Sequence, residues 1–431
     1  MQKSEGKMKK KYSNAQRVTI SICLFFLLTV SALEPCTVAV ISGKATADGR
    51  PLLWKNRDTG QPNNKVVFIK GEKYGFLGVI NSEDNNATSV WQGINSMGFA
   101  IINSASNDLL PEKGIASGNG VLMRRALGVC ADVGEFEDLL QSTNGKRRVA
   151  ANYGVIDAHG HACFFETSRG SYVKFDANDP ETAPSGYILR TNFAFSAQEK
   201  NRGGGYIRFE RISHIFEEGA AGEKLNLQFI IKKASRDLAN EKLRSFPLTL
   251  DLKTDAASPR YIRTNDTINR ISTISVSVFH GAPGIEKPHL ATMWIILGQP
   301  ICSVALPLWV TSQSVPSVLG GPETAPMHDL SKKLIAYLYH DQRGNMKQYM
   351  DLSRFLNYKD NGFLSQIFSI EDQVIRETDQ KLKEWEINEP SQKEFKTYME
   401  KAAKKAFKAL QDSFADILKE TIPSVGDPGY S

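Results

Sequence analysis

The order in which two hydrophobic patterns occur along the 431 residues limits the folds open to this chain. Short apolar runs rich in β-branched and aromatic residues dominate the chain before Pro326, and turn signals such as Asp48-Gly49 separate them. Helical spacing interrupts these runs twice, and after Pro326 it continues to residue 420. This order of strands, helices, strands and a helical tail favours sheet layers covered by helices over alternating βαβ units.

The individual elements follow from the same two patterns. The predicted strands are 37–42, 51–56, 66–69, 76–80, 91–95, 98–104, 151–157, 162–166, 172–175, 186–190, 273–279, 292–297 and 303–310. The predicted helices are 121–129, 136–140, 206–218 and 225–238, followed by several helices within 328–420. In the last of these, Lys401, Lys404, Lys405 and Lys408 form a solvated face; a basic face that contacts lipid is the alternative.

Composition is that of an ordinary folded protein, with 41% hydrophobic and 23% charged residues. The formal net charge is +6, but residues 1–35 hold six cationic and two acidic side chains, so +4 of it lies there. The remaining +2 gives no reason to expect nucleic-acid binding.

The first 35 residues have the parts of an export signal. A basic region ends at Arg17, an apolar segment covers 18–30, and Val30-Ser31-Ala32 offers a small-residue cleavage site. We therefore predict a signal peptide plus a short propeptide over 1–35 and a periplasmic or extracellular protein. A membrane anchor is the alternative, which the short apolar segment disfavours.

Cys36 follows this segment and opens the first β-like run. A thiol attacks only as its thiolate, and an N-terminal cysteine carries its own base, an α-amine that titrates near 7.7–8.0. The amine becomes available when the Pro35–Cys36 bond is broken, which the Cys36 thiol can do by attacking the Pro35 carbonyl. We interpret Cys36 as a nucleophile that self-processing places at the N-terminus.

The run Lys55-Asn56-Arg57-Asp58 places two cations and a carboxylate about twenty residues after Cys36. Asp58 could hold the ammonium, and Lys55 or Arg57 could stabilise the thiolate or a substrate oxygen. In a strand, Lys55 and Arg57 share one face and Asp58 takes the other. The alternative is a polar strand end before the Thr59-Gly60 turn.

These residues occur within a pattern that resembles the N-terminal-nucleophile hydrolases. It is most similar to the acyl-CoA:6-aminopenicillanate acyltransferase-like proteins (peptidase family C45), which are related to penicillin V acylase, bile salt hydrolase and acid ceramidase-like amidases. The order and spacing of several stretches between Cys36 and Val310 carry the resemblance. They are Cys36-Thr37-Val38-Ala39-Val40, Asn56-Arg57-Asp58, 93–100, 152–157, 164–168, Arg190-Thr191-Asn192-Phe193 and 293–309.

The resemblance implies an α+β fold, a four-layer αββα sandwich with antiparallel sheets. It implies a hydrolase domain over 36–326, and the helical spacing after Pro326 predicts a helical extension over 327–431 that packs on this domain. The resemblance also implies an amidase or acyltransferase that cleaves a carbon–nitrogen amide bond through a thioester and passes the acyl group to water or an amine.

The resemblance assigns roles to several positions. Cys36 matches the nucleophile, Asp58 the aspartate that contacts the α-amine, and Asn192 an asparagine of the oxyanion hole. Lys55 stands where the family has arginine, so either Lys55 or Arg57 takes that role.

Weaker assignments concern substrate or oxyanion contacts. Asn103 and Ser104 end a predicted strand where the family has such a contact. Arg270, just before a predicted strand, is the first choice for a later family arginine, and Arg260 and Arg263 compete with it.

Two other functions stay open at this stage. One is an N-terminal-nucleophile dipeptidase, and the other is a non-enzymatic exported lipoprotein with lipid on Cys36. We expect a small-molecule amide or acyl substrate, no cofactor, no metal, no nucleic acid and no stable membrane partner after signal removal. The odd number of remaining cysteines, Cys130, Cys163 and Cys302, suggests no disulfide framework.

Overall fold

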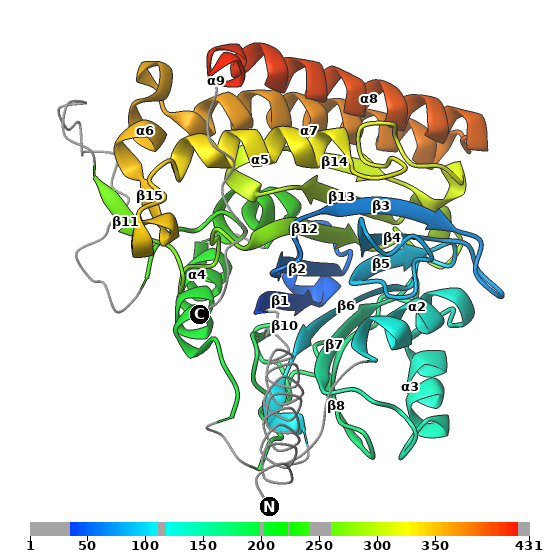
Figure 1. Ribbon diagram of the computed structural model, residues 1–431. Coiled ribbons are helices and arrows are strands. Elements are labelled where there is room, and N and C mark those ends of the chain that lie inside the picture. Colours follow the sequence, from blue (N-terminus) through cyan, green and yellow to red (C-terminus); the bar gives the residue numbers. More distant parts are fainter. Residues whose placement is uncertain (1–34, 111–117, 199–201, 223–224, 241–259, 421–431) are drawn as a thin grey trace, which may run out of the picture. The chain divides into compact units, whose positions relative to one another are not determined.

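Two antiparallel sheets form the centre of the computed structural model, which describes residues 35–110, 118–198, 202–222, 225–240 and 260–420 (Figure 1). Of the predicted signal peptide and propeptide, 1–35, all but residue 35 lies outside the described residues. The six-stranded sheet has the order β10 (Tyr187–Arg190), β1 (Cys36–Ile41), β2 (Leu52–Asp58), β12 (Thr273–His280), β13 (Thr292–Leu297), β14 (Ala305–Leu308). The seven-stranded sheet runs in chain order through β3 (Asn64–Ile69), β4 (Phe76–Asn81), β5 (Gln92–Asn95), β6 (Ala100–Ala105), β7 (Ala151–Ile156), β8 (Ala162–Thr167) and β9 (Tyr172–Asp176).

The two sheets pack face to face, and helices cover their outer faces. Val38 and Val40 of β1 share a hydrophobic cluster with Ile102 and Phe164 of the other sheet. A second cluster joins the outer face of the seven-stranded sheet to α2 (Asn119–Val129) and α3 (Val133–Ser142), with Phe136 at its centre. The layers are therefore helix, sheet, sheet, helix, the αββα arrangement that the resemblance implied (Figure 1).

Strand β1 lies in the middle of this arrangement. It pairs with β2 on one side and with β10 on the other, and every one of its residues is buried. A strand covered on both faces needs a continuous apolar run rather than alternation, and Val38-Ala39-Val40-Ile41 supplies one. The residue at its start is Cys36, so the fold places this cysteine inside the protein.

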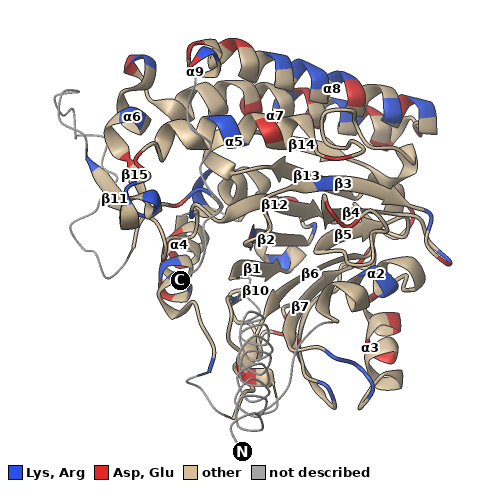
Figure 2. Ribbon diagram, in the orientation of Figure 1, with Lys and Arg blue, Asp and Glu red and all other residues tan. Residues whose placement is uncertain are grey.

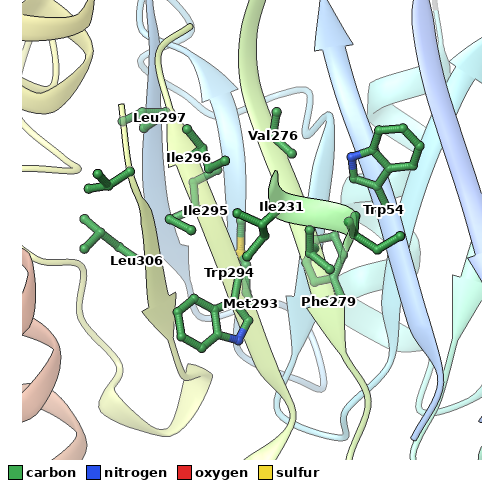
Figure 3. Packing of buried hydrophobic residues seen from close by; sticks show 14 of the residues in the cluster. Trp54, Ile231, Val276, Phe279, Met293, Trp294, Ile295, Ile296, Leu297 and Leu306 are labelled. Carbon is green, nitrogen blue, oxygen red and sulfur yellow. The ribbon is translucent and has the colours of Figure 1, made fainter. Parts of the chain in front are cut away.

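The outer face of the six-stranded sheet packs against the remaining helices. Ile231 of a short π-helix, η3 (Phe229–Ala234), lies over β12 and β13 in Figure 3, in the same hydrophobic cluster as Trp54, Val276 and Trp294. Trp54 of β2 stacks on Phe216 of α4 (Tyr206–Gly222), with ring centroids 6.2 Å apart. This packing holds α4, which carries part of the candidate site, against β1 and β2.

The C-terminal helices continue the same hydrophobic cluster. They are α5 (Pro326–Leu338), α6 (Leu352–Asn357), α7 (Phe363–Ile387), α8 (Gln392–Ser413) and α9 (Ala415–Lys419). Ser391 and Glu394 form a capping box that starts α8, and Pro326 occupies the first turn of α5. No helix among the described residues is long and apolar enough to cross a membrane.

The lysines predicted as a solvated face of α8 are exposed, and Figure 2 marks the Lys and Arg positions along this helix. Three of them pair with acidic neighbours: Lys404 with Glu400, Lys405 with Glu377, and Lys408 with Asp412, at 2.6–3.1 Å. Exposed pairs of this kind stabilise a fold by about 1 kcal/mol or less each.

A buried ion pair fastens α7 to the six-stranded sheet. Both terminal nitrogens of Arg236 donate to Glu371, at 2.7 and 2.8 Å, and both side chains are almost fully buried. Glu371 also accepts from the backbone of Ala305 in β14 at 2.8 Å. The pair therefore connects the segment after η3, the last strand of the sheet and the helical tail.

Most predicted elements occur in the structure, with three differences. The predicted helix 225–238 contracts to a short helical segment ending at Ala234 that is mainly the π-helix η3. Two short paired strands, β11 (Tyr261–Arg263) and β15 (Tyr349–Asp351), were not predicted, and β15 interrupts the helical tail. Three residues are too few for hydrophobic alternation to reveal a strand.

Replacing Glu371 should destabilise the protein strongly. Glu371→Gln leaves the buried Arg236 guanidinium without its counter-charge, and removing one member of such a pair costs about 3–5 kcal/mol. Urea unfolding followed by circular dichroism measures this loss. Glu377→Gln, on the same helix but in an exposed pair, should cost about 1 kcal/mol or less. Equal losses in the two variants would contradict the assigned role of the buried pair.

His328 of α5 should make stability depend on pH. It is buried and its Nε2 lies 2.8 Å from the carbonyl oxygen of Pro62; burial lowers its pKa from 6.5 to about 4. The unfolded chain therefore takes up a proton as the pH falls below 6.5, whereas the folded chain does so only near pH 4.

The stability that neutral His328 contributes is complete above pH 6.5 and is lost as the pH falls through about 4. At pH 5 the loss in the free energy of unfolding is roughly 2 kcal/mol. His328→Gln should remove this part of the acid sensitivity. Urea midpoints at pH 7 and pH 5 check it, with the exposed His159→Gln as the control. An unchanged difference between the two midpoints in His328→Gln would refute the assignment.

Candidate active site

Cys36 stands at the first position of β1, and its side chain lies inside the sandwich. The residue is 2% exposed and pairs with Arg57 of β2. Residues paired across an antiparallel ladder point to the same face, and Cys36 also shares a face with Val38 and Val40. Because Val40 packs against Gly154 of β7, this face is the one turned toward the seven-stranded sheet.

Side chains hold the Cys36 backbone from both of its ends. Its N–H donates to Oδ1 of Asn192 at 2.9 Å, and its carbonyl oxygen accepts from Nη1 of Arg208 at 2.6 Å. Arg208 also donates to Asn192 Oδ1 at 2.7 Å and to Thr37 Oγ1 at 2.9 Å. These contacts form a closed loop that fixes the nitrogen next to the thiol.

Asn192 lies just after β10, and its amide is oriented by its partners. Its Oδ1 accepts from two donors, while its Nδ2 donates to the carbonyl oxygen of Ala105 at 2.9 Å. A reversed amide would place donors against donors, so this assignment follows from the network. The carbonyl end of Asn192 therefore faces Cys36, and its role as an oxyanion donor stays a prediction.

Arg208 is in the first turn of α4 and is 2% exposed. Its guanidinium reaches the site beside Gly205, which has φ +80°, and a Cβ at Gly205 would lie 2.4 Å from Nη2 of Arg208. Burial lowers the pKa of Arg208 to about 10; the Arg270 charge adds to this, whereas Asp58 and Cys36 oppose it. Arg208 stays a cation at neutral pH, within electrostatic range of the Cys36 thiol.

Asp58, at the end of β2, is fully buried and is held by groups from the start of β12. Thr273 Oγ1 donates to its Oδ1 at 2.5 Å, and Arg270 Nε lies 3.5 Å from its Oδ2. Burial raises the pKa of Asp58, and the nearby guanidinium groups of Arg270 and Arg208 oppose the rise. The structure thus brings Asp58, Arg270 and Arg208 into one charged group beside Cys36.

Lys55 and Arg57 connect the two sheets. Lys55 Nζ donates to the carbonyl oxygen of Trp91 at 2.8 Å and to Asn103 Oδ1 at 2.7 Å. Arg57 donates to Asn64 at 2.7 Å and to Asn81 at 2.8 Å, and it lies over the Trp91 ring. Both cations share the face of Cys36, as the alternation in the strand predicted, while Asp58 takes the other.

The weaker candidates are placed unequally. Asn103 binds Lys55, and Ser104 Oγ accepts from Asn152 Nδ2 at 3.1 Å. Asn152 Nδ2 also donates to the carbonyl oxygen of Phe193 at 3.0 Å, so this pair borders the loop that carries Asn192. Arg260 and Arg263 are exposed near β15, and of the three arginines considered only Arg270 lies against Asp58.

Sequence reasoning did not identify Arg208 or Asn152. The helix that carries Arg208 was predicted, and its position directly after Gly203-Gly204-Gly205 signals a close backbone approach. That signal cannot say which arginine of the helix points inward. Asn152 sits in a buried strand, where an amide side chain among apolar residues marks a polar network.

Comparisons with known proteins give a distant likeness. The sequence matches no protein-family model and no curated protein. The chain is similar to a mutant form of conjugated bile acid hydrolase from Clostridium perfringens, with a TM-score of 0.38 and 13% identity over 61% of this chain and 89% of that one. It is similar to penicillin V acylase from Agrobacterium tumefaciens, with a TM-score of 0.38 and 14% identity over 69% and 96%. It is also similar to a penicillin G acylase from Alcaligenes faecalis, with a TM-score of 0.35 and 10% identity over 89% of this chain and 79% of that one.

Proposed function

We propose that this chain is a self-processing amidase or acyltransferase of the N-terminal-nucleophile type, related to peptidase family C45, with Cys36 as its nucleophile. It would be exported, lose residues 1–35 and cleave a carbon–nitrogen amide bond. One observation carries the proposal: separate side chains hold the nitrogen and the carbonyl oxygen of a buried cysteine that opens a central strand. Fixing the backbone nitrogen of a residue is useful to catalysis when that nitrogen is itself the base.

The chemistry then runs through the thiol and the freed amine. The amine takes the thiol proton, and Sγ attacks the amide carbonyl carbon to form a tetrahedral adduct. The carbon–nitrogen bond breaks as the α-ammonium returns the proton to the leaving nitrogen, which leaves a thioester on Cys36. Water or an acceptor amine attacks the thioester carbonyl carbon and gives up a proton to the α-amine. The carbon–sulfur bond then breaks, which releases the acid or the new amide, and the α-ammonium returns its proton to Sγ.

The charged residues beside Cys36 favour both the thiolate of its side chain and the ammonium of its freed amine. Asn192 Oδ1 accepts from the nitrogen and so aims its lone pair, while the Arg208 cation favours the thiolate. Asp58 offsets the buried cations and favours the transient ammonium. Lys55, held between Trp91 and Asn103, keeps the seven-stranded sheet at a fixed distance from the nucleophile, a structural use of the position where the resemblance has arginine.

The burial of Cys36 bears on the lipoprotein alternative. Lipid chains on a cysteine have to leave the protein surface, whereas Cys36 is 2% exposed and pairs with Arg57 of β2 in a strand that has neighbours on both sides. The dipeptidase alternative concerns the substrate rather than the nucleophile, and substrate profiling decides it.

Replacing Cys36 should stop maturation. In Cys36→Ala neither the attack on Pro35 nor the later acyl transfer has a nucleophile, so we expect a chain that still carries Pro35 and has no amidase activity. Intact-mass analysis of the purified protein measures this, and the wild type should begin at Cys36. Cys130→Ala, a buried cysteine of the other hydrophobic cluster, should mature normally. A wild-type N-terminus elsewhere, or a Cys36→Ala chain that begins at residue 36, would contradict the proposal.

Replacing Arg208 with lysine should slow turnover while the fold persists. A lysine keeps the charge but cannot serve the carbonyl of Cys36, Thr37 and Asn192 together. We expect kcat to fall about tenfold to a hundredfold, or roughly 1.4–2.7 kcal/mol, with slower release of Cys36. The matched control is Arg211→Lys on the same helix, where the arginine pairs with Asp237. Unchanged kcat in Arg208→Lys would remove Arg208 from the mechanism.

A further inference from the structure

Strand β12 has an irregularity where it pairs with the end of β2. Ser275 of β12 pairs with Arg57 of β2. The next pair is Thr273 with Asp58, so Ile274 is an extra residue in β12. An extra residue in one strand of an antiparallel pair is a β-bulge, and bulges beside active sites commonly redirect a side chain.

The bulge decides which way the Thr273 side chain points. In an unbroken strand Thr273 and Ser275 would lie on the same face of the sheet, because side chains alternate. Ser275 lies on the face of Arg57, and both side chains donate to Oδ1 of Asn64, at 3.3 and 2.7 Å. The extra residue moves Thr273 to the opposite face, which is the face of Asp58.

Two hydrogen bonds fix the direction of the Thr273 hydroxyl. Its Oγ1 accepts from the backbone N–H of Arg270 at 3.1 Å and lies 2.5 Å from Oδ1 of Asp58. An ionised carboxylate can only accept, so the hydroxyl proton points at Asp58. The N–H of Thr273 also donates to the carbonyl oxygen of Arg270 at 3.0 Å. One residue therefore holds both the carboxylate and the backbone of the arginine that faces it.

The second oxygen of Asp58 has no hydrogen-bond partner among the residues that the structure describes. This atom, Oδ2, is buried, and Nε of Arg270 lies 3.5 Å from it. Buried acceptors are almost always paired in folded proteins, and an unpaired one is unfavourable. Oδ2 is therefore the oxygen of Asp58 that can take a further donor.

The pairing of β1 with β2 brings Asp58 to the N-terminal end of β1. Arg57 pairs with Cys36, so the next step of the same register puts Asp58 opposite Pro35, the residue whose removal would free the amine. Arg208 acts on both sides of this point, because it donates to the Cys36 carbonyl at 2.6 Å and its charge acts on Asp58. The ammonium that removal of Pro35 creates would therefore face Asp58.

We propose that Thr273 is a positioning residue for the nucleophile: its hydroxyl holds Asp58 through Oδ1 and leaves Oδ2 for the α-ammonium of Cys36. This proposal rests on the proposed function and adds a residue to it. Thr273 acts through Asp58 and does not itself contact the reacting atoms.

The proposal predicts how the pKa of Asp58 responds to substitution. Burial raises this pKa, and the guanidinium groups of Arg270 and Arg208, the Thr273 hydroxyl and the Lys55 ammonium oppose the rise. A donated hydrogen bond opposes it because it stabilises the carboxylate and not the acid. Thr273→Val should therefore raise the pKa of Asp58 further, whereas Thr273→Ser keeps the hydroxyl and should not.

The pKa of Asp58 can be measured without a substrate. The full chain is labelled with carbon-13 at the aspartate carboxyl groups and titrated by NMR, and the Asp58 signal is the one that Asp58→Asn lacks. We expect a higher pKa in Thr273→Val and the wild-type pKa in Thr273→Ser. The matched control is Thr292→Val, because Thr292 is buried in the neighbouring strand β13 and donates to the carbonyl oxygen of Leu290 at 3.0 Å. An unchanged pKa of Asp58 in Thr273→Val would overturn the proposal.

A comparison of the mature and unprocessed chains tests the contact with the ammonium. Cys36→Ala should keep Pro35 and so lack the α-ammonium, which leaves Asp58 with a higher pKa than in the mature wild type. Equal pKa values in the two proteins would also overturn the proposal. A wild type that keeps Pro35 by intact mass refutes the proposed function and the ammonium contact with it. In that case the Thr273→Val titration still decides whether Thr273 holds Asp58.

The rate of Cys36 acylation measures the consequence for catalysis. Sγ attacks the carbonyl carbon of 4-nitrophenyl acetate, the α-amine takes the thiol proton, and the carbon–oxygen bond breaks to release 4-nitrophenolate. We expect acylation about tenfold slower in Thr273→Val, because Asp58 no longer holds the ammonium in place. Thr273→Ser and Thr292→Val should react at the wild-type rate. A loss that Thr273→Ser does not restore, or no loss in Thr273→Val, would contradict the positioning role.

Discussion

The hydrogen bonds at the two ends of Cys36 connect both sheets and one helix layer of this structure. Asn192 reaches the cysteine from the end of β10, and Arg208 reaches it from α4. Asn192 is held in turn by Ala105 at the end of β6, in the other sheet. The position of one nitrogen therefore depends on both sheets and on a helix layer. A site built this way needs both sheets and α4, because no single hairpin or helix contains all of the residues that make its contacts.

Charge is handled differently at the site and in the helical tail. Arg236 and Glu371 form a bidentate pair in which backbone groups satisfy the remaining donors and acceptors. Around Cys36, by contrast, the buried cations Arg208 and Arg270 share the buried carboxylate Asp58, whose contact with Arg270 is long at 3.5 Å. Burial raises the pKa of Asp58 and lowers that of Arg208, and the neighbouring charges of opposite sign do not cancel these shifts. Shifts of this kind are common where proton transfer takes place.

The sequence predicted the fold class well because the period of the hydrophobic pattern is a local property. The strands around Cys36 and the long helices after Pro326 can each be recognised from the hydrophobic period of a short stretch of sequence. The alternation in β2 also predicted that Lys55 and Arg57 share a face opposite Asp58. The partners of these charged side chains could not be predicted from the sequence. Lys55 binds Asn103 and Arg57 binds Asn81, contacts across two sheets that spacing along one strand cannot reveal. Arg208 was missed for the same reason, since its role appears only when α4 lies against β1.

The contact between Asn192 and the Cys36 nitrogen exists while that nitrogen is still joined to Pro35. A peptide N–H and an amine N–H can each donate to the same oxygen. The acceptor for the amine is therefore in place before the proposed cleavage after Pro35 would create that amine. Under the proposed maturation, latency of the precursor is therefore covalent rather than conformational. Its activation would follow first-order kinetics, independent of protein concentration, and would need no rearrangement of the strand on which Cys36 stands.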